Sequence, residues 1–139
     1  YFDVEQFDVN VEQRYNALGK RVTVAMAVVK VKVDGETLIS AGEGNGPVNA
    51  LDAALRKALI PVYPELEDMR LVDFKVRILD SAGGTAATTR VMIESADAKG
   101  RRWSTIGVSP NIVDASYNAL YDAITYKLFR DGATPAQPA

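Results

Sequence analysis

The sequence predicts an α+β fold of two pseudo-symmetric βββα units, in which three-stranded antiparallel sheets pack on paired helices. Two observations lead to this prediction. Alternation of apolar and polar residues, typical of half-buried strands, gives way to an apolar period near 3.6, typical of a helix, and does so twice. Glycines also recur at one constant spacing, Gly35 with Gly100 and Gly42 with Gly107. The chain is therefore predicted to be one domain, residues 1–132, built from repeats 1–64 and 65–132.

The first repeat contains three predicted strands and one helix. Val9 and Val11 alternate with polar residues in the first strand, Asp34-Gly35 is a hairpin signal, and Pro61 and Pro64 stop the helix. The predicted strands are residues 1–15, 21–33 and 36–41, followed by a helix with its apolar stripe at Val48, Leu51, Leu55, Ala58 and Leu59.

The second repeat follows a charged connector, residues 65–70. Its predicted strands are residues 71–80, 88–96 and 102–108, and its helix is 111–130. The glycine spacing, applied to the opening strands, pairs Phe7, Val9 and Val11 with Val72, Phe74 and Val76. Gly46 and Asn111 fall at helix N-caps, with Asn49 and Asp114 at N3 as in a loose capping box. Gly132 ends the helix, and residues 133–139 are predicted to be a disordered tail.

The second helix is apolar on more than one side. A helix with such a wide apolar surface is expected to be covered by a sheet and by another helix or subunit, so a homodimer is predicted. One stripe comprises Val113, Tyr117, Leu120, Ile124 and Leu128, and the other comprises Ala115, Ala119, Ala123 and Tyr126.

Composition excludes several classes of function. The 139 residues are 47 % hydrophobic, which is enough for one core. The net charge of −2 does not favour binding to nucleic acid or to an anionic membrane. No apolar run approaches the roughly 20 residues of a membrane span. The absence of cysteine excludes disulfides, and the absence of histidine removes the commonest general base and metal ligand. We therefore expect no catalytic residue, metal or cofactor here. The opening at Tyr1 suggests a piece of a longer protein.

Several motifs carry competing interpretations. Residues 42–47, Gly-Glu-Gly-Asn-Gly-Pro, could cradle a phosphate, but they lack the Gly-Lys-Ser/Thr and Gly-x-Gly-x-x-Gly spacings, so a tight strand-to-helix joint is favoured. Asp68, Asp73 and Asp80 are interpreted as solvated acids rather than as a metal cluster. Ser109 is interpreted as a helix-start residue because no histidine can activate it.

Two further features remain open between packing and binding. Trp103 beside Arg101 and Arg102 could form a stacking surface, although packing is the commoner role of a strand aromatic. The small residues at 83–88 could leave room for a ligand or form a simple hairpin loop, and the residues alone do not decide between them.

These motifs resemble the C-terminal regulatory domain of the 2-isopropylmalate synthase and (R)-citramalate synthase family. The resemblance rests on Gly-Glu-Gly-Asn-Gly-Pro-Val-Asn-Ala at 42–50, on Leu-Val-Asp-Phe at 71–74 with Gly-Thr-Ala at 84–86, and on the second junction at 107–116. It covers residues 2–129, and the segment 90–128 looks more like the citramalate branch.

The resemblance implies a function. Its parent enzymes condense acetyl-CoA with a 2-oxo acid, as acyltransferases, in a cytoplasmic metal-dependent barrel that is absent from this chain. The domain would dimerise, contact the parent's catalytic domain, and bind the pathway's end-product amino acid for feedback inhibition. The usual effector would be leucine in isopropylmalate synthases and isoleucine in the citramalate branch. A structural dimerisation domain without an effector site is the alternative, and a free-standing enzyme is disfavoured by the missing histidine and cysteine. The effector and the 2-oxo acid are not fixed by the sequence.

The resemblance also implies an effector pocket. Glycines and a helix start would receive the carboxylate of the amino acid, and an apolar strand face would receive its side chain. Tyrosine is common in this family where the chain has Phe74, which lacks the hydroxyl. The implied effector-binding residues are Gly44, Gly46, Val48, Asn49, Leu71, Phe74, Ile78, Thr85, Ala86, Thr88 and Pro110.

Overall fold

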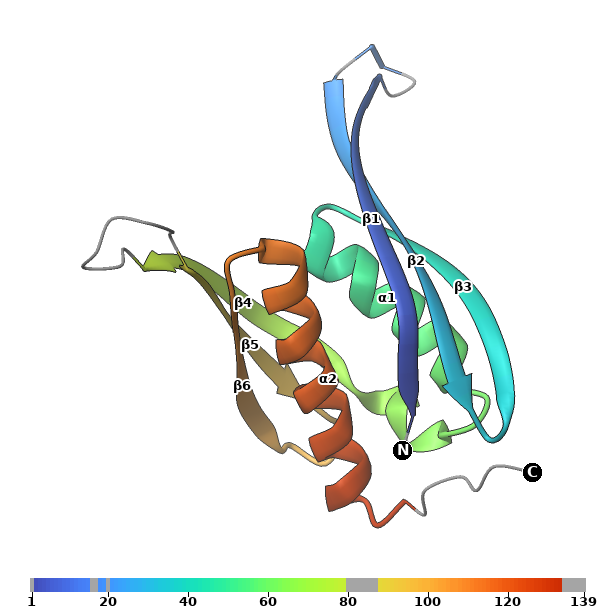
Figure 1. Cartoon of the computed structure of the whole chain (residues 1–139). Helices are drawn as coiled ribbons and strands as arrows, with labels where there is room; N and C mark the ends of the chain where they lie inside the picture. The colour runs from blue at the N-terminus through green and yellow to red at the C-terminus, as the bar shows by residue number, and fades with distance from the viewer. Residues whose placement is uncertain (1, 16–17, 20, 80–87, 134–139) are drawn as a thin grey trace. The chain divides into compact units, whose positions relative to one another are not determined.

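A computed structural model describes residues 2–15, 18–19, 21–79 and 88–133 of the chain (Figure 1). These residues form two compact units that divide between Pro64 and Glu65. Each unit has three strands followed by a helix, so the predicted pair of βββα units is confirmed. In chain order the elements are β1 (Asp3–Tyr15), β2 (Arg21–Val33), β3 (Glu36–Gly44), α1 (Pro47–Leu59), a 3-10 turn (Pro64–Asp68), β4 (Arg70–Leu79), β5 (Thr88–Ala96), β6 (Arg102–Ser109) and α2 (Ile112–Arg130).

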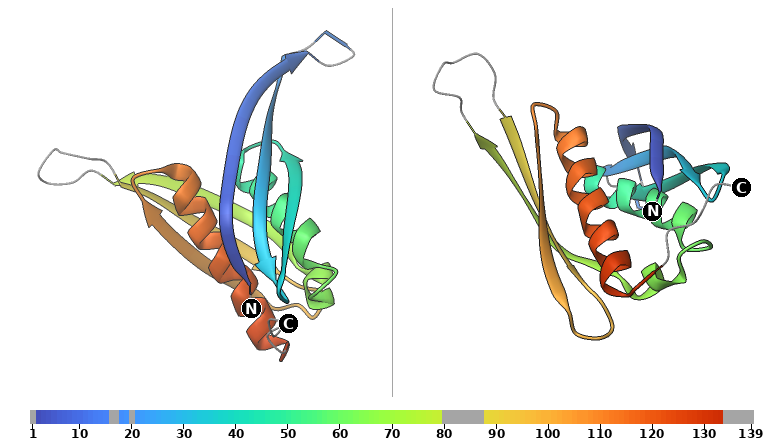
Figure 2. Two further views of the ribbon diagram at one scale, coloured as in Figure 1. Left: turned by 45° about the vertical axis from the view of Figure 1, so that its right-hand side comes forward. Right: turned by 60° about the horizontal axis from the view of Figure 1, so that its bottom comes forward.

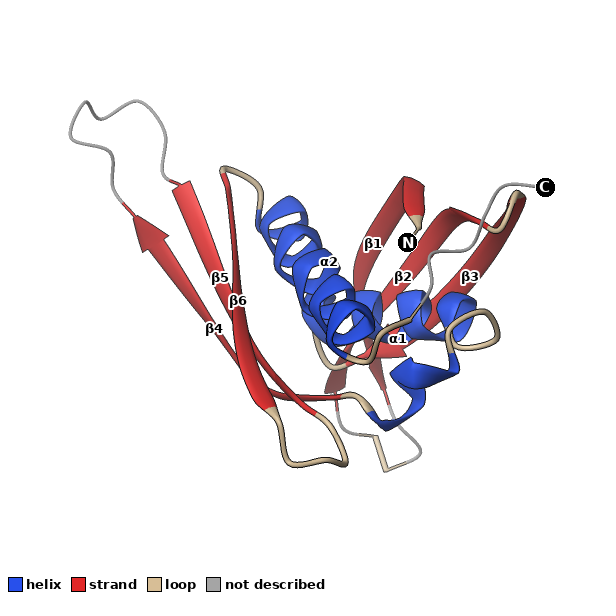
Figure 3. Cartoon of the chain, turned by 90° about the horizontal axis from the view of Figure 1, so that it is seen from below, coloured by secondary structure: helices blue, strands red, loops and turns tan. Residues whose placement is uncertain are grey.

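The first unit is an antiparallel sheet of order β1-β2-β3 with α1 packed mainly on β3 and β2 (Figure 3). Alternate residues of β2, from Ala25 to Val33, are buried, and so are Leu51, Leu55 and Leu59 of α1. The β2–β3 turn places Asp34 and Gly35 at φ of 53° and 73°, the left-handed geometry of a two-residue hairpin, as the Asp-Gly signal predicts.

The β1–β2 hairpin is longer than the rest of its sheet (Figure 2). Its pairing continues to Tyr15 and Arg21, whereas β3 pairs with β2 only as far as Gly44 opposite Ala25. Strand β3 itself runs to Gly44 and so passes the predicted end at Ala41, because the glycine junction stays in the sheet until the helix begins.

The second unit repeats the arrangement, with sheet order β4-β5-β6 and α2 packed on β6 and β5. Val91 and Ile93 of β5 are fully buried. Trp103 of β6 is buried too, and its indole Nε1–H donates a hydrogen bond to the Ala123 carbonyl at 3.2 Å. The packing interpretation of Trp103 is therefore confirmed, and the stacking surface is excluded.

The opening strands of the two units do not correspond at the spacing that the glycines predict. Ala27 of β2 lies opposite both Gly42 and Val9, and Val91 of β5 lies opposite both Gly107 and Val76. Strands β1 and β4 therefore pair Val9 with Val76, whereas the glycine spacing pairs Val9 with Phe74. By the same register Phe7 corresponds to Phe74. The predicted spacing holds for the glycine junctions but not for the opening strands. The reason is that the β1–β2 and β4–β5 connections differ in length.

The strand-to-helix joints repeat in atomic detail. A Cβ on Gly42 would lie 2.5 Å from the Ala54 nitrogen and 2.9 Å from the Ala50 oxygen. A Cβ on Gly107 would meet the corresponding atoms, the Ala119 nitrogen and the Ala115 oxygen, and would overlap the latter. Each helix thus rests directly on a glycine of the third strand. This is the close approach expected of the glycine junction.

The two helix starts differ in capping. The Asn111 side-chain oxygen accepts hydrogen bonds from the N–H groups of Val113 at 2.7 Å and Asp114 at 3.3 Å, and the Asn111 N–H donates to Ser109 Oγ. Ser109 therefore supplies the second half of the cap that was expected from Asp114, and its helix-start role is confirmed. Gly46 is the N-cap of α1, as predicted, and it has no side chain to accept a bond.

The end of α2 is fixed by hydrogen bonds after the last turn. Gly132 has a φ of 69°, and the Ala133 N–H donates to the Leu128 carbonyl at 3.0 Å. Gly132 thus ends the helix as predicted. Residues 134–139 lie outside the described part, so their disorder stays a prediction.

Candidate functional site

The predicted apolar strand face exists on β4. Leu71 lies opposite Ser95 and Phe74 opposite Ile93, with a register shift at Val72 between them. Opposed residues share one side of an antiparallel sheet. The bulge therefore brings Leu71 onto the same side as Phe74 and Ile78, which a regular strand would not do for residues of odd and even number.

This face is turned toward the α2 side of the sheet but remains accessible. It shares that side with the buried residues Val91 and Ile93, whereas α2 itself packs on β5 and β6. Phe74 is 37 % exposed and Ile78 is 67 % exposed. An edge strand with an accessible apolar face offers a wall for an aliphatic ligand.

The other main group of predicted residues lies at the start of α1, in the first unit. The first intrahelical bond runs from the Ala50 N–H to the Gly46 oxygen, so the amides of Val48 and Asn49 precede it and have no partner within the helix. The Val48 side chain is buried in the core. A Cβ on Gly46 would have no atom within 4 Å, whereas one on Gly44 would lie 2.6 Å from the Asn49 Cβ.

The remaining predicted residues are dispersed. Thr88 begins β5 opposite Leu79, and exposed Pro110 precedes the Asn111 cap. Thr85 and Ala86 lie outside the described residues. The predicted set is thus divided between two units, with Gly44, Gly46, Val48 and Asn49 in the first and the other described members in the second.

Two hollows in the described surface lie elsewhere. One, of about 250 Å³, is lined by Lys75, Arg77, Arg90 and Met92. The other, of about 130 Å³, is on the first sheet and includes Asp8, Lys30 and Ile39 among its lining residues. Among the described residues, no member of the predicted effector set lines either hollow.

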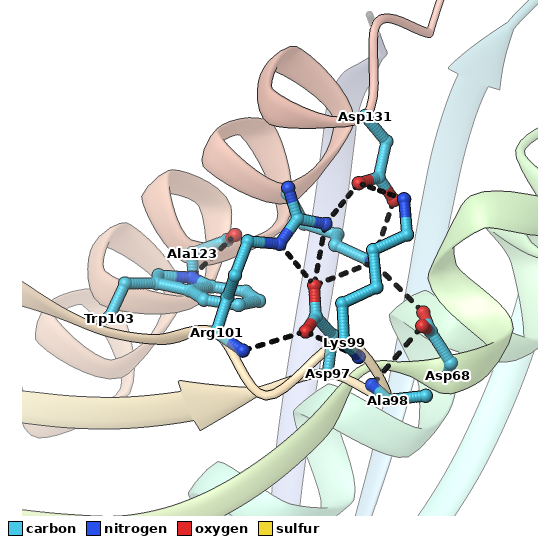
Figure 4. Close-up of polar contacts among 9 residues, drawn as sticks. Asp68, Asp97, Ala98, Lys99, Arg101, Trp103, Ala123 and Asp131 are labelled. Carbon is cyan, nitrogen blue, oxygen red and sulfur yellow. Dashed lines mark hydrogen bonds and ion pairs between the residues drawn. The ribbon is translucent and has the colours of Figure 1, made fainter.

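The second unit also holds a buried ion cluster that was not predicted (Figure 4). The Lys127 ammonium, on a side chain with no exposed surface, is 2.6 Å from Asp131, 2.9 Å from Asp68 and 3.1 Å from Asp97. Arg101 pairs with the carboxylates of Asp97 and Asp131. The cluster joins the C-terminal end of α2 to the β5–β6 turn and to the 3-10 turn.

The cluster is held in its charged form. Burial alone would raise the pKa of Asp97, but hydrogen bonds from Arg101 and Lys127 outweigh it and hold that pKa far below its ordinary value. Burial opposes the charge on Lys127 as well, yet its hydrogen bonds to Asp131 and Asp68 raise its pKa. The pKa values of Asp68 and Asp131 are lowered by the same contacts.

The interpretation of Asp68 as a solvated acid is wrong. One of its carboxylate oxygens pairs with Lys127, and the other accepts a hydrogen bond from the Ala98 N–H at 3.2 Å. The one signal in the sequence was Lys127, a cation one helical turn before Asp131 and next to the apolar stripe.

No grouping of three or more acidic side chains suited to a metal ion occurs among the described residues. No helix within that same part is long and apolar enough to cross a membrane.

Comparison with known proteins gives a consistent family assignment. The family model for the LeuA allosteric (dimerisation) domain matches residues 1–128. The chain is 51 % identical over 130 residues to an (R)-citramalate synthase of Geobacter sulfurreducens, a match that covers 94 % of this chain and 24 % of that protein.

Further relatives carry the names of two enzymes. An (R)-citramalate synthase of Streptomyces coelicolor is 47 % identical over 137 residues, covering 99 % of this chain and 25 % of that protein. A 2-isopropylmalate synthase of a Parafrankia species is 34 % identical over 112 residues, covering 77 % of this chain and 18 % of that protein. The chain thus spans about a quarter or less of the length of these relatives.

Proposed function

This chain belongs to the LeuA allosteric (dimerisation) domain family, and from that membership we propose that it is the regulatory and dimerising domain of an acyltransferase of the citramalate or isopropylmalate synthase type. The parent enzyme would condense acetyl-CoA with a 2-oxo acid in a separate, metal-dependent catalytic domain of the cytoplasm. This chain would bind a branched-chain amino acid and transmit feedback inhibition. The match of nearly the whole chain to (R)-citramalate synthases carries the proposal.

The citramalate branch is favoured over the isopropylmalate branch. Identity is 51 % and 47 % to the two (R)-citramalate synthases, over at least 94 % of the chain, against 34 % to the 2-isopropylmalate synthase over 77 %. Because isoleucine is the usual effector implied for the citramalate branch, we propose isoleucine, with leucine as the competing ligand.

Two separate features support amino-acid binding. A branched side chain needs an apolar wall, which the accessible face of Leu71, Phe74 and Ile78 supplies. A carboxylate is stabilised by amides at a helix N-terminus, and the α1 start has the N–H groups of Val48 and Asn49 beside Gly46, where a Cβ would meet no neighbour. Phe74 has no hydroxyl, so it can contribute only apolar contact.

The alternative is a structural dimerisation domain without an effector. Calorimetric titration of the chain with isoleucine, leucine and valine separates the two possibilities. The proposal expects saturable binding with isoleucine tightest, and the absence of heat with all three amino acids would favour the alternative. Light scattering should show a homodimer at about 10 µM protein, a concentration suited to a stable interface. The isolated chain should not condense acetyl-CoA with any 2-oxo acid.

A further inference from the structure

The outer face of the second sheet carries a hollow lined by three cations, and the acids Asp73 and Glu94 lie at the next cross-strand pair of the same face. Lys75 lies opposite Met92 and Arg77 lies opposite Arg90, so all four side chains are on the side away from Val91 and Ile93 and from α2. They line a hollow of about 250 Å³. Within the described residues, no carboxylate is in ion-pair contact with Lys75, Arg77 or Arg90.

The position of Arg77 directly opposite Arg90 is unfavourable when no anion is bound between them. Like charges that face each other across two strands repel and destabilise the pairing. Lys75 is the diagonal neighbour of Arg90, which adds a third positive charge to the same surface. A nearby cross-strand contact, Arg102 with Glu94 at 3.1 Å, shows that this face accommodates a balanced ion pair.

The first unit supplies a comparison, because the fold itself does not require these cations. By the register of the two sheets, Lys75 and Arg77 correspond to Asp8 and Asn10 of β1. Arg90 and Met92 correspond to Met26 and Val28 of β2. The equivalent surface of the first sheet therefore has no cation at these four positions, and the positive hollow is specific to the second unit.

We propose that this hollow is a binding site for a small organic dianion, either a phosphate ester or a dicarboxylate. Two guanidinium groups suit oxygen anions because each presents paired donors in a plane, and Lys75 adds a third point of charge. Met92 supplies an apolar, adaptable contact for the carbon part of the ligand. The site lies on the opposite face of the sheet from Phe74 and Ile78, so it is separate from the apolar face proposed for the amino-acid effector.

The test is calorimetric titration of the whole chain with sodium glycerol 3-phosphate and with disodium succinate, at matched ionic strength so that general screening is constant. Arg77→Gln and Arg90→Gln should each weaken binding of the preferred anion roughly five- to tenfold, the size expected for losing one net hydrogen bond at an exposed site. Lys30→Gln, which removes one cation from the outer face of the first sheet, should leave the affinity unchanged. Stronger binding of glycerol 3-phosphate would identify a phosphate-ester site, and stronger binding of succinate would identify a dicarboxylate site.

Thermal melts of the same variants without ligand test whether each variant remains folded. Arg77→Gln should melt at the same temperature as the unaltered chain or slightly higher, since it removes repulsion. The proposal is overturned if neither anion binds saturably, or if Lys30→Gln weakens binding as much as Arg90→Gln. It is also overturned if a polyglutamate peptide binds and both small anions do not, because the surface would then recognise an acidic protein segment.

Discussion

Gly107 of β6 lies so close to Ala115 of α2 that a methyl group on Gly107 would overlap the Ala115 carbonyl oxygen. Because that oxygen belongs to the helix backbone, it cannot move aside as a side chain could. We expect Gly107→Ala to lower the free energy of unfolding by about 3 kcal/mol, the upper end of the usual range for overpacking. Urea denaturation measures the change.

The matched control for this substitution is Gly46→Ala, where the added methyl would have no neighbour within 4 Å. Gly46 has a φ of −158°, an extended conformation open to any residue, so the left-handed turn that would have made glycine necessary there is absent. An equal loss of stability in the two variants would contradict the close packing at Gly107.

The buried ammonium of Lys127 should matter more for stability than any surface cation. Lys127→Met would leave Asp97, whose side chain has no exposed surface, with Arg101 as its remaining cation. We expect a loss of about 3 kcal/mol, as for removal of one partner from a buried ion pair. Lys57→Met, on the exposed side of α1, should change stability by less than about 0.5 kcal/mol. Comparable losses in the two variants would refute the structural role of the cluster.

The same cluster predicts acid sensitivity. The pKa values of Asp68, Asp97 and Asp131 lie below their ordinary value of 3.8 in the folded chain. Their contribution is therefore complete above that value and is lost as pH falls through the lower folded values. The stability difference between the unaltered chain and Lys127→Met should be constant from pH 5 to 9 and shrink below about pH 4. A constant difference down to pH 2 would show that these carboxylates are not coupled to Lys127.

At alkaline pH the stability contributed by Lys127 changes in the opposite direction, because it is lost as pH rises. The pKa of Lys127 is raised above its ordinary value of 10.5, so its contribution is present below that value and is lost as pH rises through the folded pKa. No loss from Lys127 should therefore be measurable between neutral pH and about pH 10.

Strands, helices and caps could be predicted because their signals are local. Alternation located β2 and β5 to the residue, and Asn111 lies at its predicted N-cap. The spacing of the glycines could not predict which residues of β1 and β4 correspond. A connection between two strands can differ in length between the units without changing the strands on either side of it. The bulge at Val72, which puts Leu71 beside Phe74, likewise leaves no mark in the apolar pattern.

The ion cluster escaped prediction for a different reason. Asp68 and Asp97 are both remote from Lys127 in the sequence, with whole strands lying between them. A lysine at the border of an apolar helix stripe ordinarily extends its charge into water, so local pattern predicts a solvated end. Only the tertiary fold brings three carboxylates to that ammonium.

The proposed apolar wall for the effector can be tested on an exposed residue. Ile78→Ser should weaken isoleucine binding roughly tenfold, because burying an isoleucine contact is worth about 1.5 kcal/mol. Ile78 is 67 % exposed, so stability should change little. Ile39→Ser on the first sheet, at 73 % exposure, is the matched control and should bind normally. Unchanged affinity in Ile78→Ser would remove β4 from the effector site.

The helix starts give a final comparison between Gly46 and Asn111. Asn111→Ala removes an acceptor for two backbone N–H groups, so it should cost about 1 kcal/mol of stability. Gly46→Ala removes no side-chain hydrogen bond and creates no clash, but alanine is a poorer N-cap than glycine. We therefore expect it to cost about 0.5 kcal/mol, less than Asn111→Ala. If the amino-acid carboxylate approaches the amides of Val48 and Asn49, the new methyl at Gly46 would obstruct it. We therefore expect Gly46→Ala to weaken isoleucine binding several-fold with a smaller loss of stability than Asn111→Ala, and Asn111→Ala to leave the affinity nearly unchanged. Titration and thermal melts of both variants measure this, and normal affinity in Gly46→Ala would leave the first glycine junction with a structural role alone.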